Sequence, residues 1–168
     1  MKIFLILLIF VSLVNSGFGQ DKLKVDRGEM AYNFVGIDQN GNEVSIDTYK
    51  GKFVLLNFTA TFCGPCWSTY NQMNKLQEEY INELKVISFH WDDDKEEWQR
   101  IADKHQIKFK CSSVWEATNK TEISEIYQVD GFPYFFLIDR NGIILKKWFG
   151  NRNNKLERVL KRCCRRVS

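Results

Sequence analysis

The sequence predicts an α/β fold in which a mixed central sheet is covered by helices on both faces. Strand-like and helical stretches alternate through the middle of the chain, which is typical of a sheet that contains parallel strands. The run 53–58 is nearly continuous in apolar residues, as expected of a central strand buried on both faces. Asn-Gly hairpin signals before and after this alternation add antiparallel strands to the sheet.

Length and composition indicate one ordinary globular domain. The chain has 168 residues, 44% of them hydrophobic and 27% charged, so it is long enough to bury one core and is neither disordered nor fibrous. We expect residues 20–168 to form this single domain. A net charge of +3, dispersed over most of the chain, is too small to indicate a nucleic-acid partner.

The first nineteen residues have the pattern of a secretory signal peptide. Lys2 precedes a largely apolar run at 3–14, and small residues end the segment at Gly19. The alternative is a retained membrane anchor, but a spanning helix needs about 20 apolar residues and this run is shorter. We therefore expect residues 1–19 to be removed and the protein to be exported, to a periplasmic or extracellular location, without membrane association.

In chain order, the first element expected is an N-terminal β-hairpin. The runs 33–37 and 43–46 flank a stretch at 38–41 that ends in Asn-Gly, the strongest short hairpin signal. The central strand at 53–58 follows, and it leads into a Cys-Gly-Pro-Cys motif.

A long helix is expected after this strand, at about 65–83, because proline favours the first position of a helix. Four apolar residues along it are spaced for one buried face: Met73, Leu76, Tyr80 and Leu84. A second buried strand is expected at 85–90.

The remaining elements are a helix at 94–105, a shorter helix at 122–127, strands at 134–138 and 143–149, and a closing helix at 155–162. In the first of these helices Trp98 and Ile101 are expected to face inward. Asn141-Gly142 between the last two strands marks a second hairpin.

Cys63, Gly64, Pro65 and Cys66 carry the chemistry expected of this chain. They stand between a buried strand and a helix, where the free amide groups and the positive end of the helix dipole stabilise a thiolate. Cys63, on the open side of the turn, is the expected nucleophile. Cys66 lies about one turn further on, where it can attack a mixed disulfide at Cys63 and release the partner.

Two other uses of a CxxC motif are less consistent with the sequence. Half of a zinc site would need further ligands, but no second CxxC or HxxxH follows, and His90 and His105 are far apart. We expect both histidines to be structural. A purely structural disulfide would gain little from closing so short a loop. We therefore expect redox exchange, with neither a metal nor a cofactor.

Three further cysteines leave an odd total of five in a chain expected to meet an oxidising compartment. Cys111 is expected to pack as a small apolar residue. Cys163 and Cys164 lie at a basic C-terminal end, where they could pair with another molecule or be incidental. The basic residues around them are expected to form a solvated helix face and tail rather than a surface for an acidic partner or lipid.

Gly131, Phe132 and Pro133 directly precede a strand, where proline is permitted. With Cys-Gly-Pro-Cys after a buried strand, this arrangement resembles the thioredoxin superfamily. The leading segment, the N-terminal hairpin and the stretches LLNFTATFCGPC and FFLIDRNGII resemble the exported TlpA/ResA-like thiol:disulfide oxidoreductases. The resemblance covers nearly all of residues 30–160.

The resemblance implies a thioredoxin-like fold in which Pro133 is cis and faces the cysteine pair. It also implies that the backbone of Phe132 pairs with an extended segment of the substrate. The expected partners are client proteins with disulfides or thiols, together with an electron donor that the sequence does not identify.

The chain departs from this family at several positions. Asn57 stands six residues before Cys63, where thioredoxins carry an aspartate, and an amide cannot accept a proton as a carboxylate does. Residues 69–71 lack the glutamate and proline common in TlpA-like proteins. Phe62 replaces a common tryptophan, and Trp67 follows the second cysteine, either as part of an apolar rim or as part of the core.

The leading functional hypothesis is an enzyme that reduces or isomerises disulfides of exported proteins. The alternative is a copper-binding or copper-delivery module, because soft thiolates suit Cu(I). Sco-type copper chaperones use CxxxC with a distant histidine, which differs from the spacing here. Peroxiredoxin-like peroxidases place their first cysteine without a CxxC partner.

Overall fold

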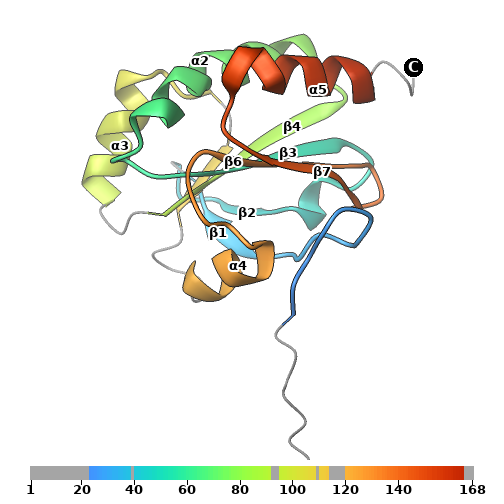
Figure 1. Ribbon diagram of the computed structural model, residues 1–168. Helices are drawn as coiled ribbons and strands as arrows, with labels where there is room; N and C mark the ends of the chain where they lie inside the picture. Colours follow the sequence, from blue (N-terminus) through green and yellow to red (C-terminus); the bar gives the residue numbers. More distant parts are fainter. Residues whose placement is uncertain (1–22, 39, 92–94, 109, 114–119, 165–168) are drawn as a thin grey trace, which may run out of the picture.

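The computed structural model describes residues 23–38, 40–91, 95–108, 110–113 and 120–164 (Figure 1). The predicted signal peptide at 1–19 and the end of the basic tail, beyond residue 164, lie outside these ranges. Within them, no helix is both long and apolar enough to cross a membrane.

A seven-stranded mixed sheet forms the centre of the molecule, with the order β2-β1-β5-β4-β3-β6-β7. The strands are β1 (Val35–Ile37), β2 (Glu43–Ser45), β3 (Phe53–Thr59), β4 (Leu84–His90), β5 (Lys110–Ser113), β6 (Tyr134–Ile138) and β7 (Ile144–Phe149). The central strands β5, β4 and β3 run parallel, while β1, β2, β6 and β7 add antiparallel pairs on either side. The predicted mixed sheet and both hairpins are confirmed.

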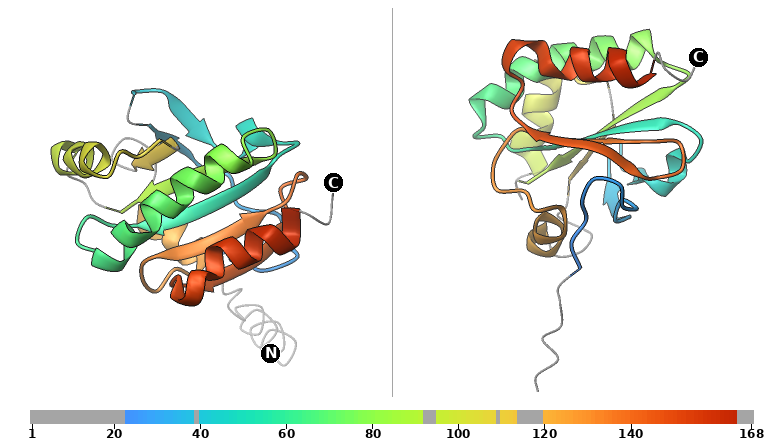
Figure 2. Two further views of the ribbon diagram at one scale, coloured as in Figure 1. Left: turned by 90° about the horizontal axis from the view of Figure 1, so that it is seen from above. Right: turned by 45° about the vertical axis from the view of Figure 1, so that its right-hand side comes forward.

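Helices cover both faces of this sheet, as predicted. Helix α2 (Gly64–Glu79) and helix α5 (Lys155–Cys164) run side by side over one face (Figure 2). Helix α3 (Lys95–Lys104) lies at the side of α2, and α4 (Lys120–Tyr127) covers the opposite face (Figure 1). Two short 3-10 turns, η1 (Asp47–Tyr49) and η2 (Arg152–Asn154), complete the described elements.

Alternate residues of β3 enter two separate cores, because successive side chains of a strand point to opposite faces. Leu55 packs in the core beneath α2 and α5, whereas Leu56 and Phe58 pack in the core beneath α4. All seven residues of β3 are buried. The strand that leads to the cysteine pair is therefore held rigidly from both sides.

An aromatic cluster dominates the core beneath α4. The ring of Phe58 lies 4.9 Å from that of Phe89, 5.2 Å from that of Tyr127 and 5.7 Å from that of Phe136, measured between centroids. The Tyr127 hydroxyl donates a hydrogen bond to the backbone carbonyl of Tyr32. Burial raises the pKa of Tyr127 well above its usual value, so this hydroxyl remains a donor at neutral pH.

Both hairpin turns use the same local chemistry. One oxygen of Asp38 accepts hydrogen bonds from the backbone N–H groups of Asn40 and Asn42, and Asp139 accepts from those of Asn141 and Ile143 in the same way. Gly41 and Gly142 follow with positive φ angles of 80° and 90°, which only glycine adopts without strain.

Two sequence expectations need correction. Helix α2 ends at Glu79, not at residue 83, because the chain turns at Tyr80 and Leu84 pairs with Phe53 in the parallel ladder of β3 and β4. Leu84 is buried as predicted, but from a strand. Strand β5 was not predicted, since its four residues, Lys-Cys-Ser-Ser, contain no apolar run. It joins the N-terminal hairpin to β4.

Candidate active site

Cys63 and Cys66 form a disulfide at the start of α2, with their Cα atoms 5.3 Å apart. Strand β3 delivers the chain to this point, and Cys63 is the N-cap residue of the helix. The backbone N–H of Cys66 donates a hydrogen bond to the sulfur of Cys63 at 3.2 Å. One free amide of the helix start is thus directed at the first sulfur, as a developing thiolate there requires.

The two cysteines differ in exposure. Cys63 is 7% exposed and is followed by the exposed residues Gly64 and Pro65, whereas Cys66 is fully buried against the core beneath α2. Cys63 is therefore the less buried cysteine of the pair. The sequence expectation that Cys63 lies on the open side of the turn agrees with this geometry.

Pro133 and the cysteine motif lie together although 67 positions separate Pro133 from Cys66. The Phe132–Pro133 peptide bond is cis, as the resemblance implied. Pro65, Phe132 and Pro133 line one pocket of about 330 Å³, and Phe149 lines it from β7. Three residues of the predicted site, Pro65, Phe132 and Pro133, thus line one depression next to the pair, whereas Cys63, Gly64 and Cys66 do not line it.

Further aromatic side chains lie next to Phe132, which lines this depression. Phe62 is 71% exposed, and its ring lies 6.1 Å from that of Phe132, which in turn lies 6.0 Å from that of Trp91. An exposed apolar patch of this kind is typical of a protein-binding surface. Trp67 does not belong to it. Its ring is half-buried against the core beneath α2 and lies near Lys104 and His105.

Beneath the pair, the face of β3 that is covered by α2 carries two polar side chains. Asn57 is fully buried, and its amide nitrogen donates to the hydroxyl of Ser88 at 2.9 Å. Its amide oxygen has no hydrogen-bond partner within the described residues. Thr59 and Tyr70 share a hydrogen bond of 2.8 Å between their hydroxyl groups, which ties the end of β3 to α2.

Both histidines lie near aromatic side chains. His90 is buried at the end of β4 with its ring 6.2 Å from that of Trp98. His105 packs against Trp67 and Tyr70, and burial together with the nearby Lys104 lowers its pKa. In the described part of the chain, no group of three or more His, Cys, Asp or Glu side chains could hold a metal ion.

A family model described as the AhpC/TSA family matches residues 27–147, a span that includes both cysteines of the pair and Pro133. The chain belongs to this family.

Individual relatives of this AhpC/TSA family member indicate its activity more specifically. The chain is 31% identical over 156 residues to a thiol-disulfide oxidoreductase ResA of Bacillus cereus, and the match covers 90% of this chain and 88% of the relative. It is 28% identical to the thioredoxin-like protein YneN of Bacillus subtilis, with 82% and 80% covered. Among solved structures, a putative thiol:disulfide interchange protein DsbE from Chlorobium tepidum has a TM-score of 0.77 at 26% identity, covering 86% of this chain and 100% of that one.

These similarities confirm the thioredoxin-like fold and the prediction that the protein is an enzyme, a thiol-disulfide oxidoreductase. Its Cys63–Cys66 pair has the disulfide geometry that such an enzyme needs. The similarities do not support the copper-binding alternative.

Of the three remaining cysteines, the structure describes the side chain of Cys163. Cys163 is a free thiol on the last turns of α5, half-buried against the core. The side chains of Cys111 and Cys164 lie outside the described part of the structure, so the expectation that Cys111 packs as an apolar residue remains a prediction.

Sequence reasoning missed three features of the site: the Thr59–Tyr70 hydrogen bond, the place of Trp91 in the rim and that of Phe149 in the pocket. A signal existed only for Thr59, a polar residue next to an apolar strand run.

Proposed function

We propose that this oxidoreductase reduces or isomerises disulfides of exported client proteins, with Cys63 as the attacking sulfur and Cys66 as the resolving one. The observation that carries the proposal is the asymmetry of the pair. Cys63 caps the helix, its sulfur accepts a hydrogen bond from the N–H of Cys66, and it is 7% exposed, whereas Cys66 is fully buried.

The cycle follows from this asymmetry. In the reduced protein, the Cys63 thiolate attacks one sulfur of a client disulfide, the client S–S bond breaks, and the other client sulfur leaves as a thiolate. Cys66 then loses its proton and attacks Cys63, which releases the second client sulfur and closes the Cys63–Cys66 bond. Two electrons pass to the client, and a donor must return two electrons to the pair.

Asn57 sets one condition on the second step. Thioredoxin-like enzymes that carry an aspartate here have a carboxylate to receive the proton of the resolving cysteine, and an amide cannot take up a proton at neutral pH. The resolving step of this protein therefore proceeds without a buried carboxylate at position 57. We expect its rate to depend on water reaching Cys66 once the client is bound.

The surroundings of the pair fit a protein client. Phe62 is exposed and Phe132 lies next to it, which offers an apolar surface to a partner. The backbone of Phe132, beside Pro133, is where an extended client segment would pair. Export to the periplasm or beyond, after removal of residues 1–19, completes the proposal, since disulfides persist in such compartments.

The direct test is a disulfide-reduction assay with insulin as the client and dithiothreitol as the donor. We expect the purified protein to accelerate reduction, and Cys63→Ser to abolish the acceleration. Metal content is measured on the same sample by mass spectrometry. A protein that fails to accelerate reduction but contains stoichiometric copper lost on Cys63→Ser would reverse the assignment in favour of metal binding.

Selective alkylation tests the roles of the two sulfurs. In the reduced protein at mildly acidic pH, iodoacetamide should modify Cys63 before Cys66, because the helix start favours the thiolate at Cys63 and that residue is less buried. Peptide mass mapping after brief labelling measures the order. Preferential labelling of Cys66 would contradict the assignment of nucleophile and resolving cysteine.

A further inference from the structure

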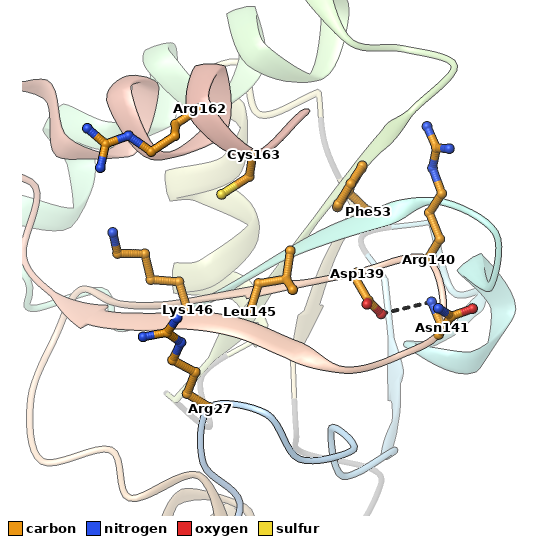
Figure 3. A pocket seen from close by; sticks show the side chains of 9 residues that line it. All are labelled: Arg27, Phe53, Asp139, Arg140, Asn141, Leu145, Lys146, Arg162 and Cys163. Carbon is orange, nitrogen blue, oxygen red and sulfur yellow. Dashed lines mark hydrogen bonds between the residues drawn. The ribbon is translucent and has the colours of Figure 1, made fainter. Parts of the chain in front are cut away.

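A second cavity lies at the start of β3, at the opposite end of this strand from the cysteine pair. Figure 3 shows the side chains that line it. Its volume is about 510 Å³, which is typical of small-molecule sites. Phe53, the first residue of β3, lines it, whereas the cysteine pair follows Thr59 at the other end of that strand. Seven residues of extended chain span roughly 20 Å, so this cavity is separate from the redox pair.

Four basic side chains from four segments converge on the cavity. They are Arg27 before β1, Arg140 in the turn between β6 and β7, Lys146 on β7 and Arg162 on α5. Within the described residues, none of the four takes part in an ion pair. The buried Nε of Arg140 also has no hydrogen-bond partner there. These cations are therefore available to a ligand.

One carboxylate, that of Asp139, lines the same cavity, but it is engaged by the turn. Its Oδ1 accepts a hydrogen bond from the backbone N–H group of Asn141, at 2.8 Å (Figure 3), and another from that of Ile143, at 2.9 Å. The lining thus carries an excess of three positive charges, as many as the net charge of the whole chain.

A smaller neighbouring cavity of about 220 Å³ extends this charge. It shares Lys146 and Arg162 with the larger one and adds Lys155 and Arg158 from α5. A concave surface lined by charge of one sign concentrates ligands of the opposite sign. The surface formed by the two cavities is therefore suited to a ligand that carries several negative charges.

A thiol lies in the wall of both cavities. Cys163 is free and half-buried, and its sulfur points into the larger cavity beside Leu145 and Lys146 (Figure 3). The Cα atoms of two bridged cysteines must lie within about 7 Å, so Cys163, at the far end of β3, cannot pair with Cys63 or Cys66. Because Cys163 is a free thiol in the wall of the cavity, a molecule bound there can react with it.

We propose that this basic cavity binds small disulfides that carry several carboxylates, of which oxidised glutathione is the type, and that Cys163 forms a mixed disulfide with them. The Cys163 thiolate attacks one sulfur of the bound disulfide, whose S–S bond breaks as the new S–S bond to Cys163 forms. The other half leaves as a thiolate and takes up the proton that Cys163 gave to water. The small disulfide is the oxidant, and its leaving half is the reduced product.

The test compares an anionic with a neutral disulfide. The full chain is used with the Cys63–Cys66 pair oxidised and Cys164→Ser introduced, so that mass mapping assigns adducts without ambiguity. Oxidised glutathione and neutral hydroxyethyl disulfide are applied separately, and adducts are counted by mass spectrometry over time. We expect glutathione to add first at Cys163. The combined Lys146→Gln and Arg162→Gln substitutions should slow that reaction about tenfold and leave the hydroxyethyl reaction unchanged.

Lys75→Gln, on the exposed surface of α2 and outside the cavity, is the matched control and should alter neither rate. If circular dichroism shows that the double variant is unfolded, the two disulfides are compared on Arg27→Gln, which changes a cation from a different segment. The proposal is overturned if glutathione adds first at Cys111. It is also overturned if the double substitution slows the reactions of the two disulfides equally, or changes the rate of neither. The cysteine pair takes no part in this reaction, so the outcome is independent of the reductase assay.

Discussion

Replacing Cys66 with serine is expected to convert the protein into one that remains covalently attached to its clients. Cys63 can still attack a client disulfide, because it keeps its exposure and its place at the start of α2. The buried sulfur that would release the client is gone, and serine cannot replace it as a nucleophile toward a disulfide. A mixed disulfide should therefore accumulate to nearly one client per protein, while turnover in the insulin assay falls to background.

Non-reducing electrophoresis, followed by mass mapping of the cross-linked peptide, measures this result. Cys63→Ser is the matched control, since it alters the other sulfur of the same pair and should trap nothing. Addition of dithiothreitol should reduce the mixed disulfide and release the client. The opposite pattern, with adducts in Cys63→Ser but not in Cys66→Ser, would exchange the two roles. Equal trapping by both variants would contradict an ordered mechanism.

The sequence was sufficient to predict the parts of this site that depend on local signals. The start of α2 follows from Pro65, and the burial of β3 follows from its nearly continuous apolar run. Both hairpins follow from Asn-Gly pairs in which glycine takes the positive φ angle that the turn requires. These features depend on a few neighbouring residues, so a single sequence contains the information.

Features that depend on distant residues were not predicted. Strand β5 has no apolar pattern of its own, and it forms by pairing with β1 on one side and β4 on the other. The end of α2 depends on the pairing of Leu84 with Phe53, 31 positions away. The cis form of Pro133 came from a family resemblance, since X-Pro bonds are cis in only about 5–6% of cases in folded proteins.

The basic cavity around Cys163 could not be predicted from the sequence for the same reason. Its four cations come from segments between residues 27 and 162 that have no common motif. From the sequence, the charges near the C-terminus were interpreted as a solvated helix face. In the fold, Arg162 is exposed, as that interpretation expects, and it also lines one cavity together with Lys146 of β7 and Arg27 of the N-terminal segment (Figure 3).

Replacing Phe58 with alanine is expected to lower the free energy of unfolding by about 3–5 kcal/mol, the usual cost of removing a fully buried aromatic side chain. Phe58 is 0% exposed, and its ring contacts those of Phe89, Tyr127 and Phe136, so three elements would line the resulting void. Urea unfolding followed by tryptophan fluorescence measures the change.

Phe62→Ala is the matched control: Phe62 is 71% exposed, so its removal should change the free energy of unfolding by less than about 0.5 kcal/mol. Phe58 points away from α2, so folded Phe58→Ala should still reduce insulin at low temperature, whereas Phe62→Ala, at the rim of the pair, should weaken client binding. A cost below about 1 kcal/mol for Phe58→Ala would mean that the core beneath α4 collapses around the void, and the rigid support inferred for β3 would then be wrong.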